Sequence, residues 1–468
     1  MSPGGSPSAP ERFDVVVVGA GTAGAAAAGM IAARGFRVAL VEARARSAAG
    51  ASWINDVPPW MFEAAGLALP ESPEKHLGGR RMRMLGETDR TRLTLEERPM
   101  WGIDCRRLVQ RLQEGAEAAG VTLLEGTRLE EVECEGERPV RVRLRRKGAR
   151  GLARTLTLRA ALFVDASGLA GALRERTPAI ARACPSPPPS DRVSAAQQIR
   201  AITDREGAAR FLERLGARPD EFLVWSGLHG GYSTQVVRID PSFESIDLLT
   251  GMMVEVDPSG GPRSLEAFAA AHPWIGEPLL AGAAIIPVRR PYDRLGFPGA
   301  ALIGEAGCQT FPAHGSGVGA GLIAARLLAD ALVGQSDPGD EAATWAYSAA
   351  FQRERGAVNA AYDVFRRTVQ GLRGEEVRHL LEVGLMTPGT TRPALEQRMP
   401  LPRPFELPAL VGGAARSPAA ATLFGGALAR MLATHALYRR YPEAPDRRAL
   451  RSFGRRLGLV SGRRGDPV

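Results

Sequence analysis

The most regular hydrophobic pattern in the chain lies in its first fifty residues. Residues 13–18 form a run of apolar, mostly β-branched side chains, which predicts a buried strand. An alanine-rich stretch from Gly24 to about Arg34 then predicts a helix that ends at Gly35, and residues 37–41 predict a second strand. Strand, helix and strand in this order predict an α/β fold built on a sheet with parallel strands.

The pattern changes after a proline-rich stretch at residues 185–190, which we take as a boundary. Short runs separated by turn residues then predict the strands of an antiparallel sheet, at 193–203, 222–228, 232–239 and 251–256. Beyond residue 341 the helical period predicts amphipathic helices at 341–370, 375–385 and 414–436. The basic tail from Arg439 is expected to be frayed.

The turn between the first strand and the helix carries the first candidate chemistry. It reads Gly19-Ala20-Gly21-Thr22-Ala23-Gly24, the GxGxxG spacing in its proper context of strand, turn and helix. Gly19 makes the tight turn, Gly21 lets the backbone approach a pyrophosphate, and Gly24 lets helix and strand pack closely. The start of a helix favours anions, and Glu42 at the end of the second strand can accept hydrogen bonds from ribose hydroxyls. The sequence therefore predicts a dinucleotide site.

Two later loops show which dinucleotide to expect. A strand at 161–164 leads into Asp165-Ala-Ser-Gly168, and a strand at 300–303 leads into Gly304-Glu305-Ala-Gly307. A glycine-rich run from Pro312 to Gly321 then opens a helix. The arrangement resembles the flavoprotein family of aromatic hydroxylases, geranylgeranyl reductases and flavin-dependent halogenases. The resemblance implies FAD as the cofactor, with Glu305 standing where the family has an aspartate on the ribityl chain.

The same resemblance implies a domain organisation. The FAD-binding domain is Rossmann-like and is assembled from residues 11–59, 99–184 and 299–333, while 60–98 and 185–298 form a substrate-binding domain whose antiparallel sheet roofs the flavin. Residues 341–468 form a helical region, either a cap or a dimer surface, and residues 1–10 a disordered tail. An arginine after Trp101-Gly-Ile-Asp104 is expected at the flavin, either Arg106 or Arg107, with a solvated helix start as the alternative. The implied cofactor-binding residues are Gly19, Ala20, Gly21, Thr22, Ala23, Gly24, Glu42, Arg106, Asp165, Gly168, Glu305, Pro312, Gly315, Gly317 and Val318.

The resemblance leaves the reaction open. Halogenases of this family carry Trp-x-Trp-x-Ile-Pro and a relay lysine, but the corresponding strand here, residues 230–238, has no tryptophan, and the local match to the lysine is Arg80 or Arg81 rather than Lys75. Geranylgeranyl reductases carry Tyr-x-Trp-x-Phe-Pro, of which only Tyr232 is present. We therefore expect an FAD-dependent monooxygenase that hydroxylates an organic, preferably aromatic, substrate through a flavin C4a-hydroperoxide.

Three alternatives stay open: a flavin-dependent reductase of an isoprenoid or other alkene, a halogenase-like enzyme, and a maturation flavoprotein that modifies a side chain of a partner protein. The last would be favoured by a cationic pocket rim built from residues such as Arg238, Arg289 and Arg290. The candidate catalytic residues are His314, which can donate a proton or bind the flavin, and Tyr232, which can orient the substrate. Packing roles are the alternatives for both. One dinucleotide fingerprint is present, so electrons are expected from NAD(P)H that docks transiently or from a separate flavin reductase.

Composition excludes several classes of partner, site and location. The net charge is +9, but only two of the 60 basic residues are lysine, a bias typical of a GC-rich genome, and we expect no nucleic-acid partner. The four cysteines lie far apart and predict neither a disulfide framework nor a metal site. The apolar stretch 15–33 is too rich in glycine and alanine for a membrane span, and the N-terminus has no signal-peptide pattern. A reducing cytoplasm is the expected location.

Overall fold

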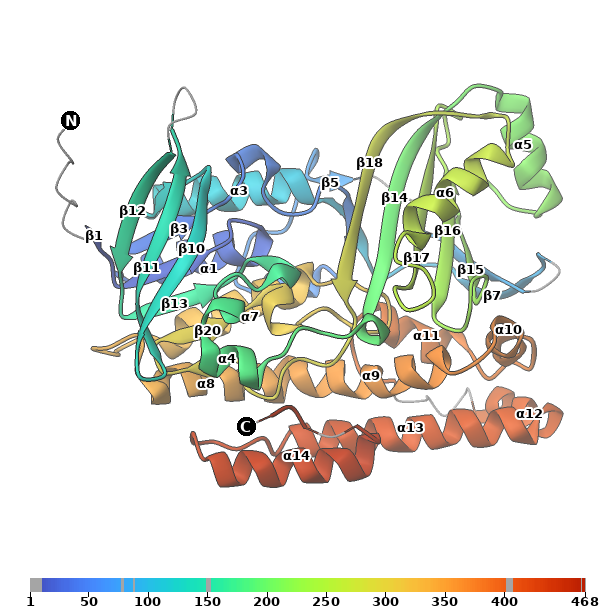
Figure 1. Ribbon diagram of the computed structural model, residues 1–468. Helices are drawn as coiled ribbons and strands as arrows, with labels where there is room; N and C mark the ends of the chain where they lie inside the picture. Colours follow the sequence, from blue (N-terminus) through green and yellow to red (C-terminus); the bar gives the residue numbers. More distant parts are fainter. Residues whose placement is uncertain are drawn as a thin grey trace.

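The computed structural model describes residues 11–76, 80–86, 89–148, 153–400, 407–463 and 465–467. Two β-rich halves lie side by side, and the C-terminal helices form a layer that runs beneath both of them (Figure 1). The predicted tail at residues 1–10 lies outside the described residues. The division into FAD-binding, substrate-binding and helical domains stays a proposal, and the sheets are therefore described one by one.

A six-stranded sheet forms the centre of one half. Its order is β19-β20-β13-β2-β3-β9, and all neighbouring pairs are parallel except β19 with β20. The four strands predicted in this region are confirmed. The bounds are β2 Val15–Val18, β3 Val38–Val41, β9 Thr122–Leu124, β13 Leu162–Asp165, β19 Gly296–Phe297 and β20 Ala300–Leu302.

Helices and smaller sheets complete this half. Helix α1 (Thr22–Ala32) packs against α3 (Cys105–Ala118) and α7 (Val318–Ala331), and its alanines lie in the largest hydrophobic cluster together with β2 and β3. A four-stranded sheet, β1-β12-β11-β10, and a three-stranded sheet, β4-β8-β5, flank the centre. Their bounds are β1 Glu11–Arg12, β10 Thr127–Glu135, β11 Arg138–Lys147, β12 Ala153–Arg159, β4 Ile54–Val57, β8 Trp101–Asp104 and β5 Lys75–His76. The helix α2 is Trp60–Ala64, and α4 is Pro178–Ala183.

A seven-stranded sheet forms the other half, in the order β18-β14-β17-β16-β15-β6-β7. It is antiparallel as predicted, apart from one parallel pair between β6 and β15. The prediction was wrong about one strand, because β17 begins at Ser245 and not at Gly251, and the strands β6, β7 and β18 were missed. The bounds are β6 Met82–Leu85, β7 Thr91–Leu95, β14 Arg192–Ile202, β15 Phe222–Ser226, β16 Ser233–Ile239, β17 Ser245–Met253 and β18 Ile275–Pro287.

The two faces of the seven-stranded sheet have different surroundings. One face packs into a hydrophobic cluster with α5 (Arg205–Arg214) and α6 (Gly260–Ala270), to which Val237, Ile239 and Leu248 contribute. The alternate residues, among them Val224, Thr234 and Leu249, point to the other side, where they line a cavity. The period of two along each strand therefore separates a core face from a cavity face.

The C-terminal region is helical, as predicted. The predicted helix over 341–370 is interrupted by one π-helical turn, and the expectation of a frayed tail after Arg439 was wrong, because residues 447–461 form an amphipathic helix whose apolar side packs on its neighbours. The described part of the chain contains no helix that is both long and apolar enough to cross a membrane. The bounds are α8 Glu341–Phe351, the π turn Gln352–Gly356, α9 Ala357–Gln370, α10 Gly374–Glu382, α11 Pro388–Leu395, α12 Leu407–Arg416, α13 Pro418–Tyr438 and α14 Arg447–Ser461.

Candidate active site

Three loops that are far apart in the sequence meet at one edge of the six-stranded sheet. Strands β2, β13 and β20 are parallel and adjacent, so the loops that follow them start side by side. A methyl group built on Gly304 would lie 3.2 Å from the Cβ of Ala23, and one on Gly168 would lie 3.5 Å from Oε2 of Glu305. These segments therefore enclose one cradle at the carboxyl edge, where open α/β sheets bind their ligands.

The turn after β2 has the geometry that the glycine pattern predicts. Gly19 has a positive φ of 106°, and a Cβ on Gly24 would lie 1.9 Å from the carbonyl oxygen of Gly19. Helix α1 begins at Thr22 with Gly21 as its N-cap, which has no side-chain cap. The backbone N–H groups of the first turn are thus left for another acceptor, and a pyrophosphate is the acceptor that this geometry suits.

Glu42 lies directly beside this turn and is buried. Its Oε2 accepts a hydrogen bond from the backbone N–H of Ala20 at 3.0 Å, and its Oε1 accepts one from the N–H of Arg44 at 2.9 Å. A carboxylate oxygen can accept more than one hydrogen bond, so each oxygen of Glu42 can still accept one from a ribose hydroxyl, as predicted.

We expect Glu42→Ala to weaken FAD binding by about tenfold to a hundredfold, because the ribose hydroxyls and the Ala20 N–H would lose a shared acceptor worth about 1–3 kcal/mol. Titration of the flavin-free protein with FAD, followed by flavin fluorescence, measures the change. Glu63→Ala is the control, since this glutamate is exposed on α2. Equal affinities of Glu42→Ala and the wild type would refute the ribose role.

The two acidic residues of the other loops differ in their surroundings. Asp165 is buried and accepts four hydrogen bonds from its own loop, from the N–H and hydroxyl of Ser167 and from the N–H groups of Leu173 and Arg174. It therefore holds the loop in shape. Among the described residues, Glu305 accepts a single hydrogen bond, from the N–H of Leu169 at 3.3 Å, and burial raises its pKa to about 7. A carboxyl group that is partly protonated near neutral pH can both donate to and accept from a ribityl hydroxyl.

The two arginines considered for the flavin lie at the start of α3. The guanidinium of Arg106 pairs with Asp104, the N-cap of α3, at 2.6 Å and is about half exposed, and Arg107 is exposed. Neither side chain lines the cavity. The same helix instead offers Gln113, whose Nε2 donates to the carbonyl of Ala20 at 3.0 Å. Sequence reasoning missed this residue, although its position between the buried Val109 and Ala116, one helical turn from each, places it on the side of α3 that faces α1.

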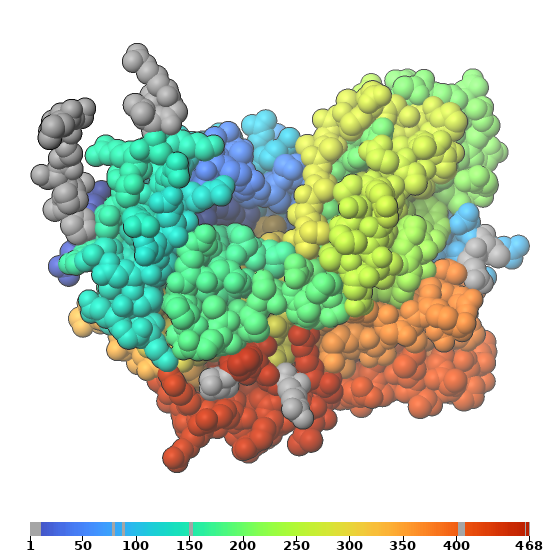
Figure 2. Space-filling view, viewed as in Figure 1, coloured from blue at the N-terminus to red at the C-terminus, as the bar shows by residue number. Residues whose placement is uncertain are grey.

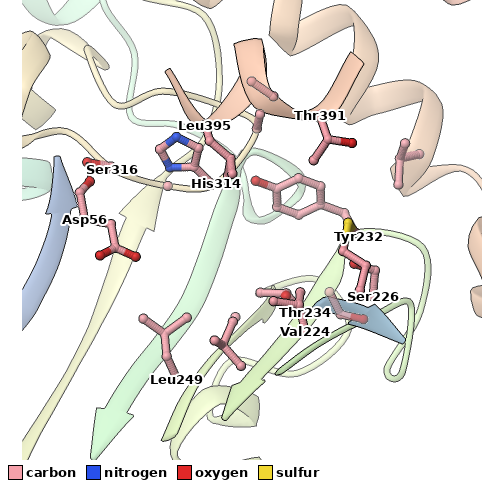
Figure 3. Close-up of a pocket in the computed structure, with 18 of the residues that line it drawn as sticks. Asp56, Val224, Ser226, Tyr232, Thr234, Leu249, His314, Ser316, Thr391 and Leu395 are labelled. Carbon is pink, nitrogen blue, oxygen red and sulfur yellow. Dashed lines mark hydrogen bonds between the residues drawn. The ribbon is translucent and has the colours of Figure 1, made fainter. Parts of the chain in front are cut away.

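The loop before α7 carries the predicted residues Pro312, His314, Gly315 and Gly317. Gly315 has a positive φ of 77°, and Gly317 is the N-cap of α7, again without a side-chain cap. The hydroxyl of Tyr232, at the start of β16, donates to the carbonyl of Pro312. Tyr232 thus ties the seven-stranded sheet to this loop, and burial raises its pKa. With its hydroxyl engaged, it presents its ring to the cavity (Figure 3).

His314 has a ring nitrogen without a hydrogen-bonding partner among the described residues. Its ring lies 4.9 Å from that of Phe311, and this nitrogen, Nε2, is buried. Burial lowers the pKa of His314 to about 4, so the imidazole is neutral at physiological pH. A neutral imidazole with a free nitrogen at a cavity wall can hydrogen-bond a ligand or carry a proton.

The shift of His314 makes stability dependent on pH. The unfolded chain binds a proton at this side chain below about pH 6.5, whereas the folded chain does so only near pH 4. The free energy of unfolding of the flavin-free protein should therefore fall by about 1–2 kcal/mol from this group between pH 7 and pH 5. His314→Gln should remove this fall in the free energy of unfolding between pH 7 and pH 5. His379→Gln, which replaces an exposed imidazole on α10, should leave the fall unchanged. Urea titrations at the two pH values test this, and identical pH dependence in all three proteins would refute it.

A cavity of about 370 Å³ extends from this loop across the seven-stranded sheet to the C-terminal helices. Figure 3 shows its two walls: Val224, Thr234 and Leu249 rise from the strands, and Thr391 and Leu395 face them from α11. Phe424, Leu428 and Met431 of α13 line its far end. The lining is predominantly apolar, and its polar groups are mostly hydroxyls and amides. The cavity therefore suits a large apolar molecule better than an ion or a sugar.

One end of the cavity carries a group of polar residues that sequence reasoning missed. Arg98 makes a two-pronged pair with Asp56, at 2.6 and 3.1 Å, and the hydroxyl of Ser316 donates to Asn55 at 2.6 Å. Gln197 on β14 accepts from the N–H of Ile54 at 2.8 Å. These contacts join β4 to β14 and to the loop before α7. No local motif marks them, because each bond connects residues at least forty positions apart.

Several residues weighed from the sequence lie away from the cavity. Lys75 stacks on Trp101, with Nζ 3.4 Å from the ring centre, and Arg81 pairs with Glu221. The idea of a cationic rim was wrong: Arg238, Arg289 and Arg290 are buried and paired with Asp247, Asp466 and Asp293 respectively. Cys308 is buried, and burial raises the pKa of its thiol to about 11, so it is an inert packing residue. The described residues contain no cluster of side chains suited to a metal ion.

Comparison with known proteins bears on the cofactor. The family model of the FAD dependent oxidoreductases matches residues 14–175, which include the glycine turn, Glu42 and Asp165. Residues 14–175 are thus similar to the FAD-dependent oxidoreductases. FAD is the cofactor of this family, and the uncapped start of α1, the close approach at Gly24, the buried Glu42 and the partly buried Glu305 fit its pyrophosphate, ribose and ribityl groups.

Individual relatives of this FAD-dependent oxidoreductase cover different parts of it. The digeranylgeranylglycerophospholipid reductase of Sulfolobus acidocaldarius is 32% identical over 103 residues, which is 22% of this chain and 23% of that protein. The matched stretch thus spans about a quarter of this curated relative. A geranylgeranyl bacteriochlorophyll reductase-like protein from Thermoplasma acidophilum has a similar structure, with a TM-score of 0.69 and 15% identity over 90% of this chain and all of that chain.

The fold is shared with proteins of other activities. PqsL of Pseudomonas aeruginosa, a probable FAD-dependent monooxygenase, has a TM-score of 0.53 and 21% identity over 77% of this chain and 97% of its own. At these identities the structural likeness establishes the fold and not the reaction.

Proposed function

We propose that this FAD-dependent oxidoreductase reduces a carbon–carbon double bond in a large, predominantly apolar substrate, of the isoprenoid kind. The observation that carries the proposal is the cavity, which begins at the loop before α7 and continues between the seven-stranded sheet and the helices α10, α11 and α13 with an apolar lining. The reductase names of two relatives add support. The sequence favoured hydroxylation, but an isoprenoid substrate needs a long apolar cavity, and the cavity here has an apolar lining that reaches from the loop before α7 to α13.

Different residues of the chain have different roles in the proposed reaction. Reduced FAD, when bound, supplies two electrons and one proton to the double bond, and a second proton must reach the other carbon. The free Nε2 of His314, which lines the cavity, can hydrogen-bond that proton source or pass the proton on. Val224, Leu249 and Leu395 exclude water and hold the chain of the substrate. The pair of Arg98 and Asp56 and the bond between Ser316 and Asn55 fix the end of the cavity where the reaction takes place.

The experiment is an anaerobic single turnover. The enzyme is reduced with dithionite, the excess reductant is removed, and geranylgeraniol in detergent is added. We expect the flavin to be reoxidised and the product to gain two mass units per reduced bond in H₂O and four in D₂O, because the N5 hydrogen of reduced flavin also exchanges with solvent. If the flavin stays reduced without oxygen over a panel of apolar alkenes, the proposal fails.

Oxygenation, the reaction expected from the sequence, is the second candidate. It is favoured by one specific observation: Thr234 and Val236 line the cavity at positions where the resembling reductases carry Trp and Phe. An enzyme of this kind would need dioxygen for turnover and would place one atom of labelled dioxygen in the product. Incorporation of that label, with no anaerobic turnover, would replace the first candidate by the second, and a requirement for chloride or bromide would indicate a halogenase.

A further inference from the structure

The net positive charge of the chain is concentrated in its C-terminal helices. Residues 407–468 contain eleven arginines and three acidic residues, a net charge of +8 out of the +9 of the whole chain. Between residues 407 and 438 there is no acidic residue at all. The composition of the full chain conceals this distribution, because the other 406 residues are almost neutral.

The C-terminal helices that carry this charge lie on one side of the molecule. Helix α13 packs against α9, and α14 packs against α13, with Tyr438, Phe453 and Leu457 joining Trp345 of α8 in one buried cluster. The sides of α13 and α14 that face away from this cluster are exposed, and Figures 1 and 2 show the C-terminal helices as an outer layer along one edge of the molecule. We call the exposed outer side of α12, α13 and α14 the C-terminal face.

Exposed arginines and exposed apolar residues alternate on the C-terminal face. Six arginines on this face are exposed and make no ion pair with any described residue. They are Arg430, Arg439 and Arg440 of α13 and the turn after it, and Arg448, Arg451 and Arg455 of α14. Among them lie Val411, Leu432 and Leu459, which are 67%, 41% and 87% exposed. Gly425 and Gly426 of α13 face open space.

The C-terminal face also lies next to the cavity. On α13, Phe424, Leu428 and Met431 line the cavity, while Leu423 and Leu432, next to them in the sequence, are exposed on the two flanks of the helix. One helix therefore separates the apolar cavity from the outer surface.

We propose that the C-terminal face docks on an anionic phospholipid membrane, with α13 between the lipid surface and the cavity. Unpaired arginines are attracted to lipid phosphates, and exposed leucine and valine side chains enter the boundary between headgroups and acyl chains. Charge complementarity selects an anionic surface, and the apolar residues between the arginines favour a lipid over a nucleic acid, which would need phosphate contacts alone. The inference deepens the proposed function and rests on it in one respect: the membrane is the phase from which an apolar substrate enters the cavity.

The test is flotation of the full-length holoprotein with vesicles, without substrate. We expect binding to phosphatidylcholine vesicles that contain about 30% phosphatidylglycerol, no binding to pure phosphatidylcholine, and loss of binding as salt is added. The triple variant Arg448→Glu, Arg451→Glu and Arg455→Glu should lower the affinity for anionic vesicles at least about tenfold. Leu432→Ser with Leu459→Ser should lower it by a smaller factor of about three to ten.

The matched control changes the same charge elsewhere. Arg128→Glu, Arg146→Glu and Arg154→Glu alter exposed arginines of the four-stranded sheet and should keep vesicle binding. Equal loss in both triple variants, or no vesicle binding by the wild type, overturns the proposal. A dimer in light scattering that Leu432→Ser and Leu459→Ser dissolve, without vesicle binding, assigns the face to a second copy. Binding of duplex DNA that survives these two substitutions, without vesicle binding, assigns it to nucleic acid.

Flotation uses no substrate, so its outcome is independent of the reaction. Where alkene reduction is observed, the arginine variant should show a higher KM for substrate presented in anionic vesicles and an unchanged kcat in detergent. A failure of reduction with intact vesicle binding contradicts the proposed function alone, and reduction without vesicle binding contradicts the docking alone.

Discussion

Gly24→Ala is expected to yield a protein that retains no FAD and has lost about 3 kcal/mol or more of its free energy of unfolding. A Cβ at this position would lie 1.9 Å from the carbonyl oxygen of Gly19 and 2.9 Å from the Cβ of Ala166. Both neighbours are fixed, since Gly19 follows the buried strand β2 and Ala166 follows β13. The helix α1 must therefore move away from the sheet, which opens the core and displaces the start of the helix from the pyrophosphate.

The measurements are the flavin absorbance of the purified protein and a urea titration. Gly115→Ala is the matched control, because Gly115 lies within the helix α3 and a Cβ added there would meet only open space. That change should leave FAD bound and should stabilise the protein by about 0.5–1 kcal/mol. A yellow Gly24→Ala protein with the stability of the wild type would contradict the close packing of α1 on the sheet.

Val224→Trp is expected to lower kcat/KM for a large apolar substrate at least about a hundredfold and to leave FAD bound. Val224 lies on β15 in the middle of the cavity wall and faces α11 across the cavity (Figure 3). An indole would occupy space that the substrate needs, so the substrate would be shut out of the cavity, while the packed face of the sheet with Leu223 and Trp225 stays intact. Because the indole fills a cavity, the free energy of unfolding should not fall.

Steady-state kinetics with the substrate identified in the anaerobic assay give the change in kcat/KM, and flavin absorbance gives the occupancy. Leu279→Trp is the control, since this side chain is 65% exposed on the edge strand β18. Normal turnover of Val224→Trp would mean that the substrate does not pass through this cavity.

The tertiary structure decided most of what surrounds the predicted site. Asp165 and Glu305 were predicted from similar loop motifs, and burial raises the pKa of both. They differ in their hydrogen bonds, because Asp165 accepts four from its own loop and the carboxyl group of Glu305 accepts one from the described part of the chain. Arg106 pairs with Asp104, because the carboxylate of this N-cap residue lies two positions before it at the start of α3. The roles proposed for these residues toward FAD stay predictions.

The chain's local patterns determined four strands of the six-stranded sheet, the place of the glycine turn and the presence of a dinucleotide site, because these features depend on residues a few positions apart. The resemblance to a flavoprotein family added FAD. The helix α14 and the true start of β17 were misjudged, since a charged helix and a strand with mixed pattern take their form from the surfaces that they cover. The cavity, the partners of Arg98 and Gln197, and the exposure of the C-terminal arginines on one outer layer depend on contacts between distant segments. No pattern along the chain records such contacts, because they exist only once the two sheets and the helical layer have packed together.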